Sequence, residues 1–256
     1  MAYSLVTNVK TGGVNGGTSA SVDTSGADLI VLWATWYDSV TLDVTVSDSK
    51  SNTWTALTLR EVEFQRGKVW YAYAPSVGSG HTFTVAGTNT YATLLMSAWS
   101  GAAASPFDQQ NGTANTNSVL STGSVTPTED NELVLAFVGF DNNSGGAVSV
   151  NASLSIIQSQ AYVAATQDGA SDAYIVQTSA GAVNPQWNIT TSTKLAVAIA
   201  TFKAASGGGG GGQPMMRRWG GASGFVGGKG IGQSGSRGGA WGRTREGIYV
   251  PRRFAA

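Results

Sequence analysis

Two groups of acidic residues are the first candidates for chemistry in this sequence. Glu61 and Glu63 lie on one side of a predicted strand, and Glu129, Asp130 and Glu132 cluster just before a strongly apolar segment. A pair of carboxyl groups is what a glycosidase needs, one as general acid and the other as base or nucleophile. Arginines flank the first pair, so we interpret it as a solvated strand face. Charges commonly mark a polar strand entry, and we interpret the second group in that way. The sequence therefore predicts no catalytic residue and no enzyme.

His81 is the only histidine of the chain, which also contains no cysteine. A metal cluster built from His and Cys is therefore excluded, and a Ser-His-Asp triad would depend on this one residue. His81 follows Gly80 at the start of a predicted strand. This place in the sequence favours a histidine on the surface, at the edge of a hairpin.

Oxygen-rich residues gather at two predicted turns: Asp48 with Asn52, and Asp141 with Asn142 and Asn143. Calcium takes several carboxylate and carbonyl oxygens, so each turn could hold calcium. Neither has the number of carboxylates or the spacing of a defined calcium loop, whereas Asp and Asn satisfy backbone donors in ordinary turns. We therefore prefer turn capping, and we expect no metal and no cofactor.

The aromatic residues raise the question of a sugar-binding platform, because flat rings stack on the faces of sugar rings. Most of them lie in segments whose neighbours are Leu, Val and Ile, so packing in the core is the default. Tyr71 and Tyr73 differ, because they alternate with Trp70 and Ala72 and so share one side of a strand. We predict that these two tyrosines form an outward aromatic stripe that could bind a glycan.

Strands, rather than helices, must position these residues. Segment 27–37 is apolar at successive positions and rich in β-branched and aromatic residues, which predicts a strand covered on both faces. Segment 41–47 alternates apolar and polar residues, which predicts a half-solvated strand. The predicted fold class is all-β, an antiparallel and jelly-roll-like β-sandwich of roughly ten strands. The other strands are expected at 52–57, 69–74, 81–85, 92–100, 132–140, 147–157, 172–177 and 194–203.

Two stretches are predicted to be turns and loops. The first 26 residues are small and polar, with turn signals at 11–13 and 15–17, and the stretch around Pro106 is similarly rich in turn residues. Segments 27–37 and 131–140 look alike, as two copies of one unit would, each with an acidic second residue and an Asp just after it. Beyond these two strands the similarity fades, so the sequence favours one domain.

Six consecutive glycines, 207–212, divide the 256 residues into two unlike parts. Residues 1–203 hold seven Lys and Arg against fourteen Asp and Glu, a net charge of −7, whereas residues 204–256 hold eight against one, a net charge of +7. We predict a β-sandwich domain at 1–203, a glycine-rich hinge at 204–213 and a basic arm at 214–256. The N-terminal residues show no secretory signal pattern, and no apolar stretch approaches the ~20 residues of a membrane span.

Between residues 20 and 203 the following runs occur in order: ADLIVLWATW, VTVSDSKSNTW, VWYAYAPSVGSGHTFTV, MSAWSG, PFD and ELVLAF. Together they resemble the jelly-roll-like β-sandwiches of phage virion proteins and bacterial surface proteins. The glycine-rich basic tail is similar to the extended arms with which viral capsid and decoration proteins reach across their neighbours. The resemblance implies assembly or surface binding, and it implies no catalytic residue.

The predicted arm combines arginines with widely spaced apolar residues. Residues 207–256 include 18 glycines, too many for the segment to bury its own core, so the simplest interpretation is a disordered linker. A linker has no use for large apolar side chains, however, and Trp and Arg often carry the binding energy of interfaces. We predict a partner-binding arm of these residues: Met215, Met216, Arg217, Arg218, Trp219, Phe225, Arg237, Trp241, Arg243, Arg245, Tyr249, Arg252, Arg253 and Phe254.

The acidic domain suggests what the basic arm binds. Charge complementarity favours other copies of this chain, in a homo-oligomer, or acidic shell or tail proteins of a virion. Nucleic acid is the competing partner, because Arg and Gly with interleaved aromatic residues also bind single strands. Arg237 begins the single RGG unit, and a domain with a net charge of −7 would repel phosphates, so nucleic acid is disfavoured.

One main hypothesis and one alternative follow. The main hypothesis is a non-enzymatic viral structural protein, a phage capsid decoration or tail component, anchored to neighbouring subunits by its C-terminal arm. Such a protein would be assembled in the host cytoplasm and located in the virion, with no membrane as a partner. The alternative is a carbohydrate-binding or adhesin module on a tail fibre or a cell surface, with Tyr71 and Tyr73 as its platform.

Overall fold

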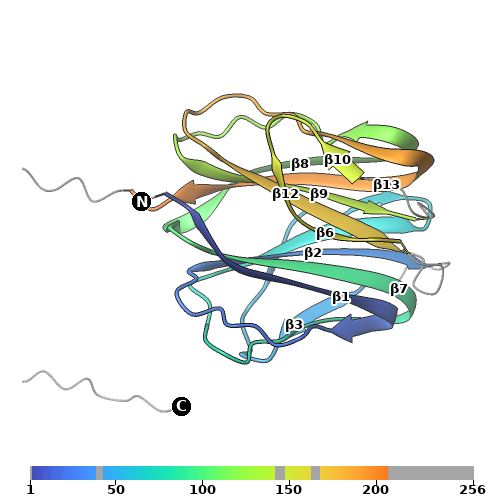
Figure 1. The fold of residues 1–256 in the computed structure, drawn as a ribbon, viewed down its shortest axis with the longest axis horizontal. Helices are drawn as coiled ribbons and strands as arrows, with labels where there is room; N and C mark the ends of the chain where they lie inside the picture. The colour runs from blue at the N-terminus through green and yellow to red at the C-terminus, as the bar shows by residue number, and fades with distance from the viewer. Residues whose placement is uncertain (1, 39–42, 142–147, 163–167, 207–256) are drawn as a thin grey trace, which may run out of the picture. The chain divides into compact units, whose positions relative to one another are not determined.

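The computed structural model describes residues 2–38, 43–141, 148–162 and 168–206, and these form thirteen β-strands. The strands make two antiparallel sheets that pack face to face, which confirms the predicted all-β antiparallel sandwich (Figure 1). The predicted arm, with every residue assigned to it, lies outside the described residues, as does most of the predicted hinge. The part of the chain that the structure describes contains no helix long and apolar enough to cross a membrane.

The first sheet is formed by the seven N-terminal strands. Its order is β1-β7-β2-β6-β4, while β3 also pairs with β7 and β5 also pairs with β6. Its strands are β1 (Ser4–Thr18), β2 (Leu29–Asp38), β3 (Thr45–Asp48), β4 (Thr55–Ala56), β5 (Arg60–Val62), β6 (Gln65–Tyr73) and β7 (Phe83–Ser100).

The second sheet is formed by the six remaining strands. Its order is β10-β13-β9-β12-β11, and β8 also pairs with β13. Its strands are β8 (Ala102–Ser121), β9 (Glu132–Phe140), β10 (Val148–Val150), β11 (Ser155–Gln160), β12 (Gly169–Gln177) and β13 (Gln186–Ala204). We call strands β1–β7 the first half of the domain and strands β8–β13 the second half.

The two halves follow one plan. Five strand pairings of the first half have counterparts in the second. The pair β1/β7 corresponds to β8/β13, β7/β2 to β13/β9, β2/β6 to β9/β12, β6/β4 to β12/β11, and β3/β7 to β10/β13. The isolated bridge between Val22 and His81 likewise has a counterpart between Val125 and Val183. The likeness that the sequence shows only in two apolar segments therefore extends to the pairing of both sheets.

The register of the paired strands is also the same in the two halves. Leu29 on β2 lies opposite Trp99 on β7, and Leu133 on β9 lies opposite Phe202 on β13. The outer strands β1 and β8 both shift register beside this position. Equivalent residues of the two halves can therefore be read directly from the strand pairing.

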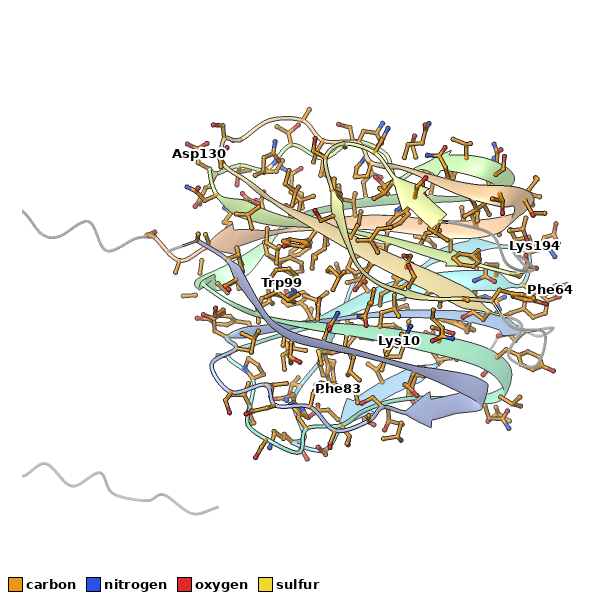
Figure 2. All side chains as sticks on the ribbon, in the orientation of Figure 1. Lys10, Phe64, Phe83, Trp99, Asp130 and Lys194 are labelled. Carbon is orange, nitrogen blue, oxygen red and sulfur yellow. The ribbon has the colours of Figure 1, made fainter. Side chains whose placement is uncertain are left out.

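Three apolar cores lie side by side through the domain. The central core lies between the sheets and includes Trp33 and Trp99, while each half has an outer core on the far face of its own sheet, which includes Phe83 in the first half and Trp187 in the second. Figure 2 shows Trp99 between the sheets and Phe83 on the outer side of the first sheet. Because β2 and β9 contribute to two cores each, both are covered on both faces, as the sequence predicts for segment 27–37.

Ring contacts across the central core occur in reciprocal pairs. Tyr71 of the first half contacts Phe202 of the second with ring centroids 5.5 Å apart, and the equivalent Tyr174 contacts Trp99 at 5.0 Å. When residue i touches j and the equivalent of j touches the equivalent of i, the interface is that of a two-fold arrangement. The halves therefore face each other about an approximate two-fold axis.

Residues near that axis meet their own equivalents. Trp33 on β2 and Phe137 on β9 are equivalent, and their rings stack with centroids 5.4 Å apart and planes 19° from parallel. The Trp33 indole Nε1–H also donates a hydrogen bond to the Val138 carbonyl oxygen at 3.2 Å. This stack joins the two sheets at the middle of the central core.

The structure corrects the expected strands in four places. The first 26 residues contain the long strand β1, and the stretch around Pro106 belongs to β8, so both predictions of turns and loops are wrong. The strands expected at 81–85 and 92–100 form the single strand β7, and segment 147–157 is divided between β10 and β11. The turn signal near Asn15 marks a register shift inside β1, where Asn15 has a φ of 61° and Gly16 a φ of 96°.

Candidate functional site

The first acidic pair lies at the surface, as the sequence predicts. The Glu61 and Glu63 side chains are 55% and 58% exposed. Glu61 accepts a hydrogen bond from Nε of Arg66 at 3.0 Å, and Glu63 lies 3.1 Å from Nζ of Lys194. Glu63 and Lys194 form an ion pair at the end of the sandwich that Figure 2 labels with Lys194 and Phe64. Arg66, the partner of Glu61, is buried and also pairs with Asp38 at 2.7 Å.

The second acidic group is divided by the fold. Glu132 is the first residue of β9, as predicted for a polar strand entry, and its side chain is completely buried. Its Oε1 accepts a hydrogen bond from the Glu129 backbone N–H at 2.9 Å, and burial raises the pKa of its carboxyl, with nearby Asp108 adding to the effect. Asp108 accepts hydrogen bonds from the Thr128 hydroxyl at 2.8 Å and backbone N–H at 3.0 Å. Both carboxyls therefore fasten the turn that leads into β9.

His81 is fully buried, so the prediction of a surface histidine is wrong. Its Nδ1 lies 2.9 Å from the Thr24 hydroxyl oxygen, and its Nε2 lies 2.9 Å from Oδ1 of Asp48. The three groups have the order of a hydroxyl–imidazole–carboxylate triad. Thr24 is also fully buried, as is the Asp48 side chain, so no substrate reaches the hydroxyl. The three residues instead join the end of β3 to the segments around Thr24 and His81, which lie far apart in the sequence.

The first of the two oxygen-rich turns does what turn residues ordinarily do. Asp48 accepts hydrogen bonds from the backbone N–H groups of Lys50 at 2.8 Å and Asn52 at 3.1 Å, as predicted for turn capping. Asp141 accepts one from the Lys194 backbone N–H at 3.3 Å, while Asn142 and Asn143 lie outside the described residues. Within the ranges that the structure describes, no three His, Cys, Asp or Glu side chains are grouped to hold a metal ion.

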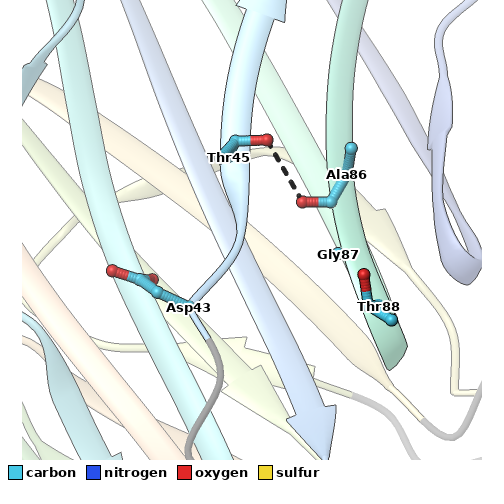
Figure 3. A pocket seen from close by; sticks show the side chains of 5 residues that line it. All are labelled: Asp43, Thr45, Ala86, Gly87 and Thr88. Carbon is cyan, nitrogen blue, oxygen red and sulfur yellow. Dashed lines mark hydrogen bonds between the residues drawn. The ribbon is translucent and has the colours of Figure 1, made fainter.

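A shallow hollow of about 270 Å³ lies between β3 and the bend of β7 (Figure 3). The Thr45 hydroxyl donates a hydrogen bond across it to the Ala86 carbonyl at 3.3 Å, and Asp43 is paired with Nζ of Lys68 at 2.6 Å. Its lining offers no aromatic face, and its one carboxylate already has a partner. This hollow is therefore a weak candidate for a binding site.

An open groove of about 470 Å³ lies where the edge of the first sheet meets β8, and it is the strongest candidate. We call it the tyrosine groove. The edge strand β4 and the residues before it form one wall, β6 forms the floor, and the start of β8 forms the other wall. Its lining residues are Thr53, Thr55, Tyr71, Tyr73, Ala104, Ser105, Pro106 and Phe107.

The rings of the groove come from both halves. Tyr71 stacks on Phe107 with centroids 5.7 Å apart and planes 14° from parallel, while its edge packs on Phe202. Tyr73, two residues along the same strand, is 39% exposed. The predicted alternation is confirmed, because Trp70 and Ala72 are buried on the opposite side of β6. The prediction that both tyrosines point outward is wrong for Tyr71, which is half-buried against the second half. Of the two, only Tyr73 is exposed.

Hydroxyl groups surround these rings. Thr53, Thr55 and Ser105 are exposed and stand beside the two tyrosines in the same groove. Binding sites for small ligands combine apolar and aromatic surface with a few polar groups that fix the orientation of the ligand. Sequence reasoning found the tyrosines but missed Phe107 and Ser105, because the stretch around Pro106 was predicted to be a turn.

Comparisons with protein-family models, with curated proteins and with solved structures found no match. Fixed rings, exposed hydroxyls and an open shape suit an extended ligand with alternating apolar faces and hydroxyl edges.

Proposed function

We propose that the β-sandwich is a carbohydrate-binding module, of the adhesin type that a phage tail or a cell surface presents. The observation that carries the proposal is the tyrosine groove, in which Tyr71, Tyr73 and Phe107 stand among the hydroxyls of Thr53, Thr55 and Ser105. This was the alternative in the sequence analysis. The residues that line the groove are among those that the structure describes, whereas the arm on which the main hypothesis depends lies outside the described residues.

Sugars match this groove for a physical reason. One face of a pyranose ring presents C–H groups, which are attracted to the negative face of an aromatic ring, while its edge presents hydroxyls. Tyr71 is held by the rings on two of its sides, so little side-chain entropy would be lost when a ligand binds. Tyr73 is exposed and would supply the face on which a sugar ring stacks.

The test is a titration of the full chain with maltotriose, cellotriose and triacetylchitotriose, by calorimetry and by amide shifts in the nuclear magnetic resonance spectrum. Tyr73→Ala is expected to weaken binding at least about tenfold, which corresponds to about 1.4 kcal/mol. Phe64→Ala is the matched control, because Phe64 is also 39% exposed and lies outside the lining of the groove. It should bind as the parent chain does.

A second variant separates binding from stability. Tyr71→Phe keeps the ring stacked on Phe107 and removes only the hydroxyl, so it should fold normally and lose a smaller part of the affinity. Binding that is unchanged in Tyr73→Ala would contradict the proposed groove. Absence of binding to all three trisaccharides, and to a wider glycan array, would contradict the proposed function.

The charge division of the chain supports a second candidate function, that of a viral structural protein. Residues 1–203 have a net charge of −7 and residues 204–256 one of +7, so the basic arm complements the acidic domain of a neighbouring copy or of an acidic virion protein. The two functions are compatible, since an arm can anchor a module that binds glycans.

The solution mass of the full chain and of a chain ending at Ser206, at low and high salt, tests this second candidate. We expect an oligomer that salt weakens for the full chain and a monomer for the shortened one. Two monomers would contradict self-assembly through the arm.

A further inference from the structure

A second open groove lies on the other edge of the first sheet, beside β1. We call it the twin groove. It has a volume of about 410 Å³, close to that of the tyrosine groove. Its lining residues are Tyr3, Ser4, Leu5, Ser153, Ser155, Tyr174, Ile175 and Val176. They come from β1, β11, β12 and the residues beside them, which are the equivalents of β8, β4 and β6.

The strand register makes the two grooves equivalent residue by residue. Thr55 on β4 lies opposite Tyr71 on β6, and Ser155 on β11 lies opposite Tyr174 on β12. Tyr174 therefore stands where Tyr71 stands, and Ser155 where Thr55 stands. The approximate two-fold axis thus converts one groove into the other.

The register also gives the equivalents of the two other ring positions of the tyrosine groove. Tyr73 pairs with Leu29, and its equivalent Val176 pairs with Leu133. Phe107 pairs with Phe202, and by the same register its equivalent is Leu5, which pairs with Trp99. Two of the three rings are therefore replaced by aliphatic side chains in the twin groove.

The two grooves share a half-buried tyrosine and a hydroxyl residue beside it, whereas the exposed ring of Tyr73 has the aliphatic Val176 as its equivalent. Each has a half-buried tyrosine that packs on an aromatic ring of the other half, Tyr71 on Phe202 and Tyr174 on Trp99. Each also has an exposed hydroxyl residue beside that tyrosine on the neighbouring edge strand, Thr55 or Ser155. The halves differ at most other positions, so a tyrosine and a hydroxyl at the same two positions indicate a shared use.

We propose that the twin groove is a second carbohydrate site, which takes the same class of ligand as the tyrosine groove with lower affinity. This inference rests on the proposed function of the tyrosine groove. The affinity is lower because Val176 and Leu5 offer no ring face. The grooves open at opposite edges of the sheet order β1-β7-β2-β6-β4, so a short glycan fills only one of them. The domain therefore binds two separate glycan chains.

Two matched substitutions test the proposal in the full chain, with the same three trisaccharides. Thr55→Trp fills the tyrosine groove and Ser155→Trp fills the twin groove, each from an exposed position on a short outer strand. Ser155→Thr, which copies the tyrosine groove, is the conservative control. Calorimetry gives the number of sites, and amide shifts near Tyr71 and Tyr174 show which groove is occupied.

The expected result is two sites in the parent chain and in Ser155→Thr. Ser155→Trp should retain only the tighter site, Thr55→Trp only the weaker site, and the double variant neither. One site in the parent chain, with shifts near Tyr71 alone and no effect of Ser155→Trp, would overturn the second site while the proposed function survives. No shift in either groove with any trisaccharide would overturn both.

Discussion

The two halves share a strand plan but differ in the polar groups that they bury at equivalent positions. On β6 the first half has Gln65 and Val69, whereas the register of β12 gives Asp168 and Asp172 in the second half. All four side chains are buried. The pairing of strands is thus the same in both halves, although the buried side chains at equivalent positions differ. The strand order therefore depends on register and apolar pattern rather than on particular residues.

The difference is most informative close to the two-fold axis, where equivalent residues touch each other. Gln65 donates a hydrogen bond from Nε2 to Oδ1 of Asp168 at 3.0 Å. Thr35 occupies space that leaves no room for a side chain at its equivalent, because a Cβ on Gly139 would lie 2.0 Å from the Thr35 hydroxyl oxygen. Residues that meet their own equivalents must complement each other, so divergence between the halves is an advantage at this place.

The largest expected effect comes from removing the stack that joins the halves. Trp33→Ala deletes a fully buried ring, its contact with Phe137 and its hydrogen bond to the Val138 carbonyl. We expect the free energy of unfolding to fall by about 3–5 kcal/mol. Denaturant titration measures the loss of unfolding free energy, and hydrogen exchange of β2 and β9 shows whether both strands are destabilised.

Trp36→Ala is the matched control for that experiment. Trp36 is equally buried but belongs to the outer core of the first half. Trp33→Ala should speed hydrogen exchange in both sheets, while Trp36→Ala should act more strongly on the first. If Trp33→Ala leaves exchange in β9 unchanged, the halves do not depend on a common core for their stability.

A smaller effect should distinguish the halves by pH. Burial raises the pKa of the Asp172 carboxyl to about 7, whereas its equivalent in the first half is the apolar Val69. Between about pH 4 and pH 7 the folded chain holds a proton that the unfolded chain has lost. The stabilisation from this proton is complete below the ordinary pKa and is lost as pH rises toward 7, with a slope of about 1.4 kcal/mol per pH unit.

Asp172→Asn should remove that slope, because an amide does not titrate in this pH range. The variant should still fold, since its amide carbonyl can accept the hydrogen bond that the Gln158 backbone N–H donates to the carboxyl. The measurement is the free energy of unfolding at several pH values for the parent chain and the variant. Burial also raises the pKa of Asp168, which is retained, so the variant keeps part of the pH dependence. Parallel curves for the two chains would contradict a protonated Asp172.

The sequence predicts best the strands that are buried on both faces. Segments 27–37 and 132–140 are continuous apolar runs, and both correspond closely to β2 and β9. The long outer strands β1 and β8 were missed because their side chains are mostly half-buried or exposed, and their composition of Gly, Asn, Ser and Thr is also that of loops. Pairing with β7 and β13, not local preference, makes them strands.

The site shows the same limit. The alternation around Tyr71 and Tyr73 could be read from one strand, because it is a local pattern. Phe107 joins them only because β8 pairs with β13, far along the chain. His81 shows the converse, since its neighbours in sequence suggest a surface turn. Thr24 and Asp48, which are distant in sequence, enclose it. Contacts between residues distant in sequence determine both outcomes.

The substitution with the smallest expected effect on stability, Val176→Tyr, would also make the two grooves most alike. Val176 is half-buried against the central core and is the equivalent of Tyr73, so Val176→Tyr should change the free energy of unfolding by no more than about 1 kcal/mol. It gives the twin groove the ring that it lacks, and a trisaccharide that binds the tyrosine groove should then bind the twin groove about tenfold more tightly. Amide shifts near Tyr174 follow that affinity separately from the shifts near Tyr71. A normally folded Val176→Tyr chain with unchanged affinity near Tyr174 would show that the grooves share a shape but not a ligand.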